Sequence, residues 1–340
     1  MLYIVLTTPK CNLQCTYCGG SLHGMPDTIT YDPMLLKELI SRDQEAVVAF
    51  YGGEPLLQPD RIIEFLELLP AKYFVINTNG FYIDSISSYL DWFNTILLSI
   101  DGRESTTDYY RGEGCYQTVK HAVEIINQSA FSGELIARMA VSNHTDIFDD
   151  VMHLLDFFPY VHWQLDAVWS ALWGVDEFVS WVKNSYEPGL KKLISHWVEE
   201  YKNGHIVGVI PFLGILTRLF SGDGSLPCGA GTSAFTITTD GSVLACPIAP
   251  DFMWNNLGDL HHFNHVCIDD PCLSCTVYSV CGGRCLFTNK ERLWGNEGFD
   301  AICGATKFLI QELSKIKSEL HIDQAKVFYP PYNNTTEIIP

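Results

Sequence analysis

Cysteines dominate the chemistry that this sequence of 340 residues could perform, since it contains 12 of them. Three lie near the amino end in a C-x3-C-x2-C pattern, as Cys11, Cys15 and Cys18. Seven more follow in the last third of the chain, as Cys228, Cys246, Cys272, Cys275, Cys281, Cys285 and Cys303. The amino end does not resemble a secretion signal, so we expect a cytoplasmic protein with reduced thiols. Metal ligation then explains the cysteines better than disulfides.

The first three cysteines follow a predicted strand, in a loop where their sulfur atoms could converge on one centre. Three thiolates on a four-iron cube leave one iron without a protein ligand, and such an open position is typical of catalytic metal sites. A structural zinc site with His23 as its fourth ligand is the alternative.

A second motif, Gly52-Gly53-Glu54-Pro55, directly follows the next predicted strand. Its two glycines permit close approach of the backbone and Pro55 stiffens the exit, so Glu54 should be held beside the cysteine loop. Together with Tyr17 inside the first cysteine motif, this pattern closely resembles the radical S-adenosylmethionine (SAM) superfamily. The resemblance covers the first domain in strand order and motif placement, and it implies a partial (β/α)6 TIM-like barrel.

In that family the three cysteines hold a [4Fe-4S] cluster that binds SAM through its open iron and yields a 5′-deoxyadenosyl radical. The resemblance implies that the glycine-glutamate motif binds the SAM amino group through Glu54, and that Tyr17 lies against the adenine. It also implies ribose or carboxylate contacts by Asn79, Asp84, Ser99 and Arg111. The residues alone leave other roles open, because Asn79 could form a turn, Asp84 could cap a helix and Arg111 could form a surface ion pair.

The later cysteines resemble the SPASM extension of radical SAM enzymes that mature peptides and peptide-derived cofactors. The resemblance implies an outer auxiliary [4Fe-4S] cluster held by Cys272, Cys275, Cys281 and Cys303. It implies an inner auxiliary [4Fe-4S] cluster that is one thiolate short, held by Cys228, Cys246 and Cys285. Either an iron is open there, or Cys267 or a non-cysteine group fills the place. The alternatives are a pair of zinc sites for the whole pattern and, for Cys115 and Cys267, ordinary buried thiols.

The reaction expected from this resemblance is oxidation or crosslinking of a residue in a peptide or protein, because a nearby cluster could accept the electron that an oxidised product must lose. In the related sulfatase maturases the residue after the hairpin cysteine is an acidic base, but here it is Pro247. Asp166 could replace it. A ferredoxin or flavodoxin would donate electrons, and a separate leader-peptide-binding protein could deliver the substrate, since no leader-binding module precedes the first strand. The alternatives are radical decarboxylation or oxidation of a small molecule or cofactor precursor, and a non-catalytic iron-sulfur electron carrier.

Alternating strands and helices must position these motifs. Apolar, β-branched runs predict strands over 2–7, 47–51, 73–78, 95–100, 135–141 and 161–168. Helical spacing of apolar residues lies between and after them, over 32–42, 58–68, 82–92, 115–128, 145–157 and 176–203. This βα repetition predicts a parallel sheet with ligands at its carboxyl edge. Three tryptophans around the sixth strand could line the barrel mouth, or they could pack in the core or at a domain interface; they are Trp163, Trp169 and Trp173.

Four segments are predicted along the chain. We expect a radical SAM core domain over 1–205, a helical connection over 206–225, a SPASM domain over 226–320 and an irregular tail over 321–340. The third segment should contain a hairpin that turns at Asp240-Gly241 and a helix over 301–320. The hydrophobic share of 47% predicts a folded protein, and the net charge of −19 disfavours nucleic acid and anionic lipid as partners. No apolar run is long enough to span a membrane.

Overall fold

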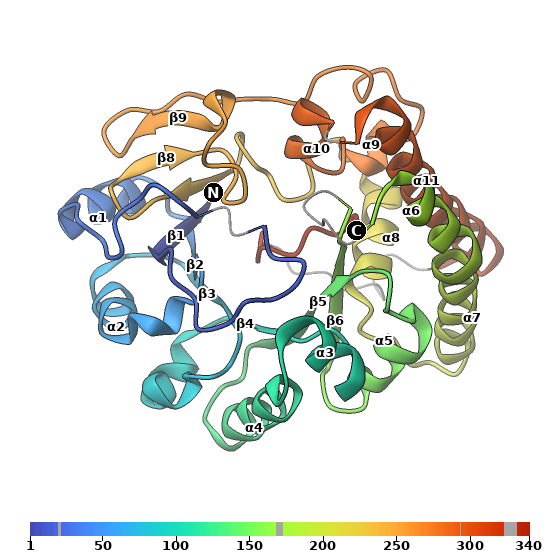
Figure 1. Ribbon diagram of the computed structural model, residues 1–340, viewed down its shortest axis with the longest axis horizontal. Helices are drawn as coiled ribbons and strands as arrows, with labels where there is room; N and C mark the ends of the chain where they lie inside the picture. The colour runs from blue at the N-terminus through green and yellow to red at the C-terminus, as the bar shows by residue number, and fades with distance from the viewer. Residues whose placement is uncertain (20–21, 168–172, 293, 323–331) are drawn as a thin grey trace.

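A single curved sheet of nine strands forms the centre of the computed structural model, which describes residues 1–19, 22–167, 173–292, 294–322 and 332–340. Its strand order is β6-β5-β4-β3-β2-β1-β7-β8-β9. Neighbours are parallel from β6 through β7, and β8 and β9 continue antiparallel. In Figure 1 the helices that connect β1 to β6 lie on the outside of the curve. The predicted α/β partial barrel is confirmed.

The first six strands agree closely with the sequence prediction. The strands are β1 (Leu2–Thr8), β2 (Val47–Gly52), β3 (Tyr73–Thr78), β4 (Thr95–Ser99), β5 (Glu134–Val141), β6 (Tyr160–Leu165), β7 (Ala234–Ile237), β8 (Ser242–Leu244) and β9 (Asn256–Asp259). Residues 47–50 of β2 and 95–98 of β4 are buried without alternation, as expected for strands covered on both faces. The sixth strand ends at Leu165, before the predicted end at 168. Strand β9 was not predicted, because its four residues include only one buried side chain.

The helices depart from prediction where the apolar spacing is weak. They are α1 (Pro33–Ser41), η1 (Pro55–Leu57), α2 (Pro59–Leu68), η2 (Ile83–Trp92), α3 (Glu104–Arg111), α4 (Cys115–Gln128), α5 (Ile147–Leu155), α6 (Val175–Trp181), η3 (Val182–Tyr186), α7 (Glu187–Lys202), α8 (Ile210–Ser221), η4 (Met253–Asn255), α9 (Tyr278–Cys281), α10 (Leu286–Glu291) and α11 (Gly295–Glu319). The helix predicted over 82–92 is present as segment η2, but it is 3-10 helical and broken at Ile86. Helix α3 was missed because its sequence, ESTTDYYR, is mostly polar.

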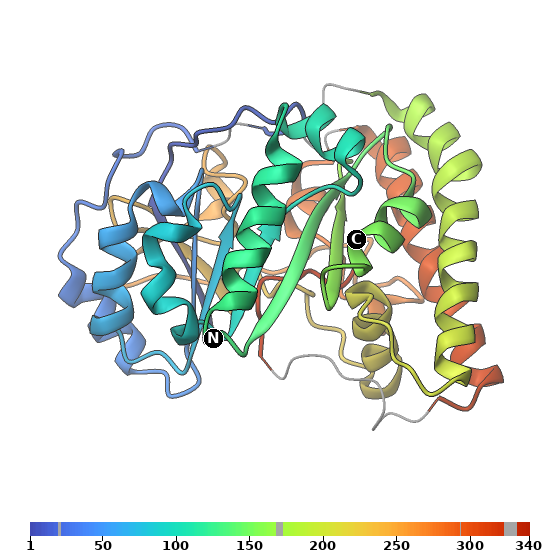
Figure 2. The same ribbon diagram turned by 90° about the horizontal axis from the view of Figure 1, so that it is seen from below.

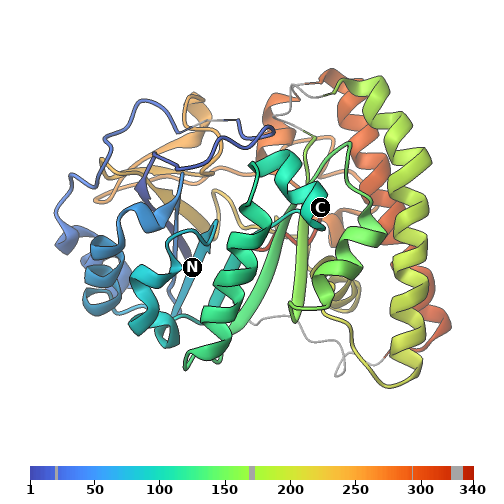
Figure 3. The same cartoon turned by 60° about the horizontal axis from the view of Figure 1, so that its bottom comes forward.

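The predicted connection over 206–225 contains a helix of the core. Helix α8 is buried along most of its length and packs against β6 and α11. Its apolar sequence therefore reflects burial on several sides, and among the described residues no helix is both long and apolar enough to cross a bilayer. Figure 3 shows α11 alongside α7 on the far side of the molecule from α1.

The cysteine-rich region continues the sheet of the barrel. Strand β7 pairs with β1, with Leu2 opposite Ala234, and the predicted hairpin leads back through β8. Gly241 adopts φ +87° in the hairpin turn, a conformation that glycine accepts without strain. The two predicted domains therefore share one set of backbone hydrogen bonds.

The last nine residues, 332–340, lie inside the curve of the sheet (Figures 1 and 2). Tyr332 stacks on Tyr73 with ring centroids 4.1 Å apart, and Arg138 on β5 donates a hydrogen bond of 3.1 Å to the Thr335 carbonyl. The side chain of Ile338 packs against Gly214 of α8. This segment has no regular structure, as the sequence indicated, but its position inside the barrel was not predicted.

Two of the three tryptophans lie in the core. The Trp163 indole is fully buried and donates a hydrogen bond of 2.9 Å to the Tyr186 hydroxyl. Trp173 donates to the Asp166 carbonyl at 2.8 Å and packs against Phe178. Both are buried, so packing rather than the barrel mouth is the correct role for them, while Trp169 lies outside the described residues.

Candidate functional site

The three amino-terminal thiols lie together on the loop after β1. Cys11 and Cys18 are exposed and Cys15 is partly buried, and the Cys18 N–H donates to the Cys15 carbonyl at 3.0 Å. Burial raises the pKa of the Cys15 thiol to about 11, and the nearby Cys18 and Cys11 thiols add to the shift. The loop thus exposes Cys11 and Cys18 and keeps Cys15 partly buried beside them.

The glycine pair after β2 fixes the start of this loop. Gly53 donates a hydrogen bond of 3.0 Å to the Thr8 carbonyl, and Glu54 donates one of 2.8 Å to the Lys10 carbonyl. A Cβ atom on Gly53 would lie 2.3 Å from the Lys10 oxygen, and one on Gly52 would lie 2.3 Å from the Thr8 oxygen. Only glycine permits this approach, so the two motifs form one backbone unit. Figure 2 shows the loop running along one edge of the strands.

The Glu54 carboxylate joins the ends of β2 and β3. Its Oε1 accepts hydrogen bonds from Thr78 Oγ1 at 2.6 Å and Leu56 N at 2.9 Å, and its Oε2 accepts one from Asn79 N at 2.8 Å. Burial raises the pKa of Glu54, and these three hydrogen bonds oppose the shift. Pro55 begins η1, whose first turn Glu54 caps.

Asn79 connects this carboxylate to the cysteine loop. Its side-chain nitrogen donates a hydrogen bond of 2.8 Å to Asn12 Oδ1 and lies 4.0 Å from the Cys11 sulfur. Its Oδ1 accepts from Phe81 N at 3.1 Å, which is the turn role that the sequence left open. The structure therefore brings the predicted Glu54 and Asn79 to the first thiol.

Tyr17 and Arg111 meet at Asp101. The Arg111 guanidinium binds both oxygens of Asp101, with Nε–Oδ2 2.8 Å and Nη2–Oδ1 2.9 Å, and the Tyr17 hydroxyl donates to Oδ2 at 2.8 Å. The Asp101 side chain is fully buried and that of Arg111 is 9% exposed, so the surface ion pair that the sequence left open is wrong. Desolvation disfavours the charged guanidinium, but Asp101 outweighs it and raises the pKa of Arg111.

The two remaining predicted SAM contacts lie apart from this network. Ser99 ends β4 and is partly buried, two residues before Asp101. Asp84 is exposed in the first turn of η2, and Tyr82 rather than Asp84 occupies the N-cap position. The helix-cap role that the sequence left open for Asp84 is therefore wrong.

Asp166, the predicted substitute base, follows β6 and is buried. Its Oδ2 accepts a hydrogen bond from Ser142 Oγ at 2.8 Å, and its N–H donates to the Val141 carbonyl at 2.8 Å. Asp166 thus connects the ends of β5 and β6 through its carboxylate and its backbone N–H.

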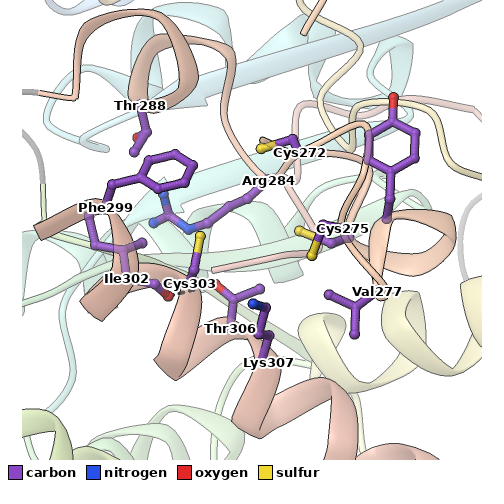
Figure 4. Close-up of a pocket in the computed structure, with 13 residues that line it drawn as sticks. Cys272, Cys275, Val277, Arg284, Thr288, Phe299, Ile302, Cys303, Thr306 and Lys307 are labelled. Atoms are coloured by element: carbon purple, nitrogen blue, oxygen red, sulfur yellow. Dashed lines mark hydrogen bonds between the residues drawn. The ribbon is translucent and has the colours of Figure 1, made fainter. Parts of the chain in front are cut away.

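Four of the later thiols line one pocket of about 450 Å³ that includes open solvent. They are Cys272, Cys275, Cys281 and Cys303. In Figure 4 the labelled sulfur atoms surround one space, with the Arg284 guanidinium beside Cys303. Burial raises the pKa of Cys281 and of Cys303 to about 11, and the neighbouring thiols add to both shifts while Arg284 lowers both. These are the four cysteines that the resemblance assigned to the outer cluster.

The other three predicted ligands form a second group. Burial raises the pKa of Cys228 to about 12, and the charges of Glu337 and Cys285 add to the shift. Burial also raises the pKa of Cys246, with further contributions from Cys285 and Cys228. The loop that carries Cys246 is held by Asn255, whose side chain bonds both the N–H and the carbonyl of Cys246 at 2.8 Å.

The remaining candidates lie outside these groups. Cys115 is buried in the first turn of α4, with its sulfur 3.4 Å from the Arg111 carbonyl oxygen. Cys267 and His23 are exposed. Among the described residues no set of three or more His, Cys, Asp or Glu side chains is grouped so that it could hold a single metal ion.

Two acidic residues of these sites were missed. Asp101 lies in the SIDG segment, where only Ser99 was considered, and its full burial is a tertiary feature. Glu337 lies in the tail that the sequence indicated to be irregular, and no local pattern marks it. A lone acidic residue followed by glycine at a strand end could have pointed to Asp101.

The amino-terminal part of the chain matches a known family. Residues 5–158 match the model of the Radical SAM superfamily. The cysteine-type anaerobic sulfatase-maturating enzyme of Clostridium perfringens (strain 13 / Type A) is 24% identical over 330 residues, which cover 84% of this chain and 88% of that enzyme. The radical SAM cyclopropyl synthase TigE of Paramaledivibacter caminithermalis is 22% identical over 380 residues, which cover 95% of this chain and 76% of TigE.

The fold is also that of solved structures. Native anSMEcpe with bound AdoMet superposes with a TM-score of 0.69 at 20% identity, over 94% of this chain and 100% of that one. Streptococcus suis SuiB bound to its precursor peptide SuiA gives a TM-score of 0.53 at 12% identity, over 84% and 71% of the two chains. Residues 5–158, which include the three-cysteine loop and most of the parallel strands, are thus similar to the radical SAM superfamily, whose enzymes use SAM and a [4Fe-4S] cluster.

Proposed function

We propose that this chain cleaves SAM reductively and uses the resulting 5′-deoxyadenosyl radical to oxidise or crosslink a residue in a peptide or protein. The observation that carries this proposal is the joining of the three-thiol loop to the Glu54 turn through two glycine contacts. Relatives support the substrate class, since the Clostridium perfringens enzyme is named as sulfatase-maturating and SuiB is bound to a precursor peptide.

The amino-terminal residues fit a cluster and SAM. Cys11, Cys15 and Cys18 would hold the cluster, because soft thiolates are its usual ligands and two of the three are exposed. The Oε2 of Glu54 accepts a single hydrogen bond in the described part of the chain, which leaves it able to accept another from an amino group. When bound, the cluster supplies the electron that cleaves SAM.

Tyr17 and Arg111 would lie beside the SAM site rather than bind SAM through the polar ends of their side chains. Both are tied to Asp101, and the guanidinium carbon lies 5.6 Å from the centre of the Tyr17 ring. The ion pair therefore fixes the orientation of the aromatic ring that the resemblance places against the adenine. Ser99, Asn79 and Asp84 remain proposed as further contacts.

The outer thiols fit a polynuclear group better than a single ion. A zinc ion needs its sulfur ligands at about 2.3 Å from the metal, whereas these four thiols surround a pocket. We propose a [4Fe-4S] cluster at this pocket and a second one at Cys228, Cys246 and Cys285. These centres would accept the electron that an oxidised product must lose.

The remaining expectations also stay proposals. Formylglycine formation is disfavoured because Pro247 occupies the position of the acidic base, and Asp166 is the proposed substitute despite its bond to Ser142. We further propose a cytoplasmic enzyme with a ferredoxin or flavodoxin as electron donor, and a separate leader-peptide-binding protein that delivers the substrate.

Anaerobic reconstitution with iron, sulfide, a reductant and SAM tests this function. We expect 5′-deoxyadenosine in chromatographic assays, and with a suitable peptide the product should lose two hydrogen atoms or gain a crosslink by mass spectrometry. If no 5′-deoxyadenosine forms while the clusters are intact, the chain would instead be an electron carrier. If it forms only with a small molecule that loses carbon dioxide or hydrogen, the peptide class is wrong.

A further inference from the structure

The pocket of the four outer thiols carries positive charge in a protein that is strongly acidic. Besides the thiols, Arg284 and Lys307 line it, and there is no aspartate or glutamate among the residues described as lining it. The whole chain has a net charge of −19. Two cations without a neighbouring carboxylate side chain, in such a chain, indicate a pocket that suits an anionic group.

Arg284 is the buried cation of this pocket. The residue is 7% exposed, and its Nε donates a hydrogen bond of 2.7 Å to the Pro340 carbonyl, which holds the guanidinium beside Cys303 (Figure 4). Within the described part of the chain, no aspartate or glutamate side chain lies within 4.0 Å of it. Three other arginines with little exposure each have such a partner; they are Arg111, Arg138 and Arg218. Because burial of a charge is costly, an anionic group in the pocket would compensate Arg284 as carboxylates compensate the other three.

The backbone at Arg284 adopts a conformation that favours glycine. Its φ is +54°, and it follows Gly282 and Gly283 with φ of +61° and +88°. A side chain opposes this left-handed conformation, so an arginine in it indicates a role for the side chain. The Arg284 N–H donates a hydrogen bond of 3.1 Å to the Cys281 carbonyl. This turn therefore places the cation next to one of the outer thiols.

A second polar group beside the pocket has no partner. Thr288 of α10 lines the pocket, and its buried hydroxyl makes no hydrogen bond to any described residue. Buried hydroxyl groups are nearly always hydrogen-bonded, because an unpaired one is costly. The sulfur atoms of an iron-sulfur cluster accept hydrogen bonds, so a cluster in this pocket would give the hydroxyl an acceptor.

We propose that the charge of Arg284 raises the reduction potential of the outer auxiliary cluster and that the Thr288 hydroxyl adds a hydrogen bond to it. The inference deepens the proposed function and rests on the presence of that cluster. Reduction adds a negative charge to the pocket, and a cation in a region of low dielectric stabilises the reduced form. The outer centre would thereby become a better acceptor for the electron that an oxidised product must lose.

The test uses the full chain with Cys11, Cys15 and Cys18 all replaced by Ala, so that only the auxiliary centres remain. In this background, Cys303→Ala identifies the outer centre by the EPR signal that it removes. In an anaerobic redox titration, Arg284→Gln should shift the equilibrium of that centre about tenfold toward the oxidised form, which is about 59 mV for one electron. Arg284→Lys keeps the charge and should restore most of the potential.

Thr288→Val tests the hydrogen bond, because valine has the shape of threonine without its hydroxyl. The variant should lower the potential of the same centre by less than Arg284→Gln does. In the iron-free protein it should resist denaturant as well as the unaltered chain, since the hydroxyl makes no described hydrogen bond there. A loss of stability in the iron-free protein would show that Thr288 bonds to the protein, and it would overturn this part of the proposal.

Arg42→Gln is the matched control, because it removes the same charge from an exposed residue of α1 that is paired with Glu38. It should leave both auxiliary centres unchanged. An unchanged potential in Arg284→Gln, or an equal shift in Arg42→Gln, would overturn the role of Arg284 and leave the proposed function intact.

Iron analysis separates the remaining outcomes. Loss of the outer iron in Arg284→Gln but not in Arg284→Lys would support a requirement for the charge. Loss in both variants would show a structural role through the Pro340 contact and would overturn the proposal. If Cys303→Ala removes no iron from the background protein, the outer centre itself is absent, and the proposed function loses it as well.

Discussion

The two thiol-bearing regions of this protein are built in opposite ways. The amino-terminal thiols lie on a loop whose hydrogen bonds to the rest of the barrel are largely backbone contacts, and Cys11 and Cys18 are exposed. None of the seven later thiols assigned to the auxiliary centres is exposed, since Cys246 and Cys272 are each 9% exposed and the other five are partly buried. An exposed centre leaves room for a small molecule to reach the metal, whereas an enclosed one suits electron transfer.

Both regions nevertheless place a buried arginine beside thiols. Arg111 lowers the pKa of Cys15 against the effect of burial, and Arg284 does the same for Cys281 and Cys303. A cation in a region of low dielectric favours the thiolate that iron requires. Both regions therefore have a positive charge beside their thiols, and they differ in how accessible those thiols are to solvent.

Replacing Cys15 with Ala should have the largest effect, because it removes the central ligand of the exposed site. We expect 5′-deoxyadenosine formation to be abolished and iron to fall from about twelve to about eight per chain. Chromatography and iron analysis measure both. Cys115→Ser is the control and should change neither; persistence of SAM cleavage in the Cys15 variant would contradict the cluster assignment.

Asp101→Asn should have the next largest effect, a loss of stability, since it leaves the buried Arg111 without its carboxylate partner. Breaking such a pair costs about 3 kcal/mol of unfolding free energy or more. Unfolding by denaturant under anaerobic conditions measures this change in free energy. The exposed pair of Lys315 and Glu312 provides the contrast, because Lys315→Ala should cost less than about 1 kcal/mol. Equal losses would show that Arg111 does not depend on this pair.

Gly53→Ala tests whether the exposed site depends on backbone contact. The new methyl group would lie 2.3 Å from the Lys10 oxygen, so the loop must move. We expect a loss of roughly 1–3 kcal/mol in unfolding free energy and weaker iron binding at the first site. Gly304→Ala meets open space on α11 and should be neutral or stabilising by up to about 1 kcal/mol. A fully loaded Gly53 variant would refute this dependence.

Cys303→Ala should have the smallest effect on SAM cleavage, although it removes a ligand of the enclosed outer site. Iron should fall by about four per chain, while 5′-deoxyadenosine formation should stay within a few-fold of the unaltered protein. Iron analysis and chromatography of the same samples measure the iron content and the 5′-deoxyadenosine formed. A loss of SAM cleavage as complete as in the Cys15 variant would contradict the proposal that the two regions have different roles.

The sequence was sufficient wherever the signal is local. The β-branched runs predict the first six strands, because burial on both faces requires continuous apolar residues. The Gly52-Gly53-Glu54 motif indicates close approach, and the structure shows which carbonyl oxygens it approaches. Helix α3 gave no such signal, because its polar residues are stabilised by contacts with α4 rather than by periodicity.

The sequence by itself indicated the resemblance to the radical SAM superfamily, the order of the first six strands and the proposed grouping of cysteines into three sets, because spacing along the chain carries that information. Only the tertiary structure decided that Asp101 pairs with Arg111 and that Asn333 donates a hydrogen bond to the Cys228 carbonyl, 105 residues away. Buried charges and polar groups find partners through packing, since desolvation makes an unpaired charge costly wherever the fold places it. No local pattern can report such a pairing.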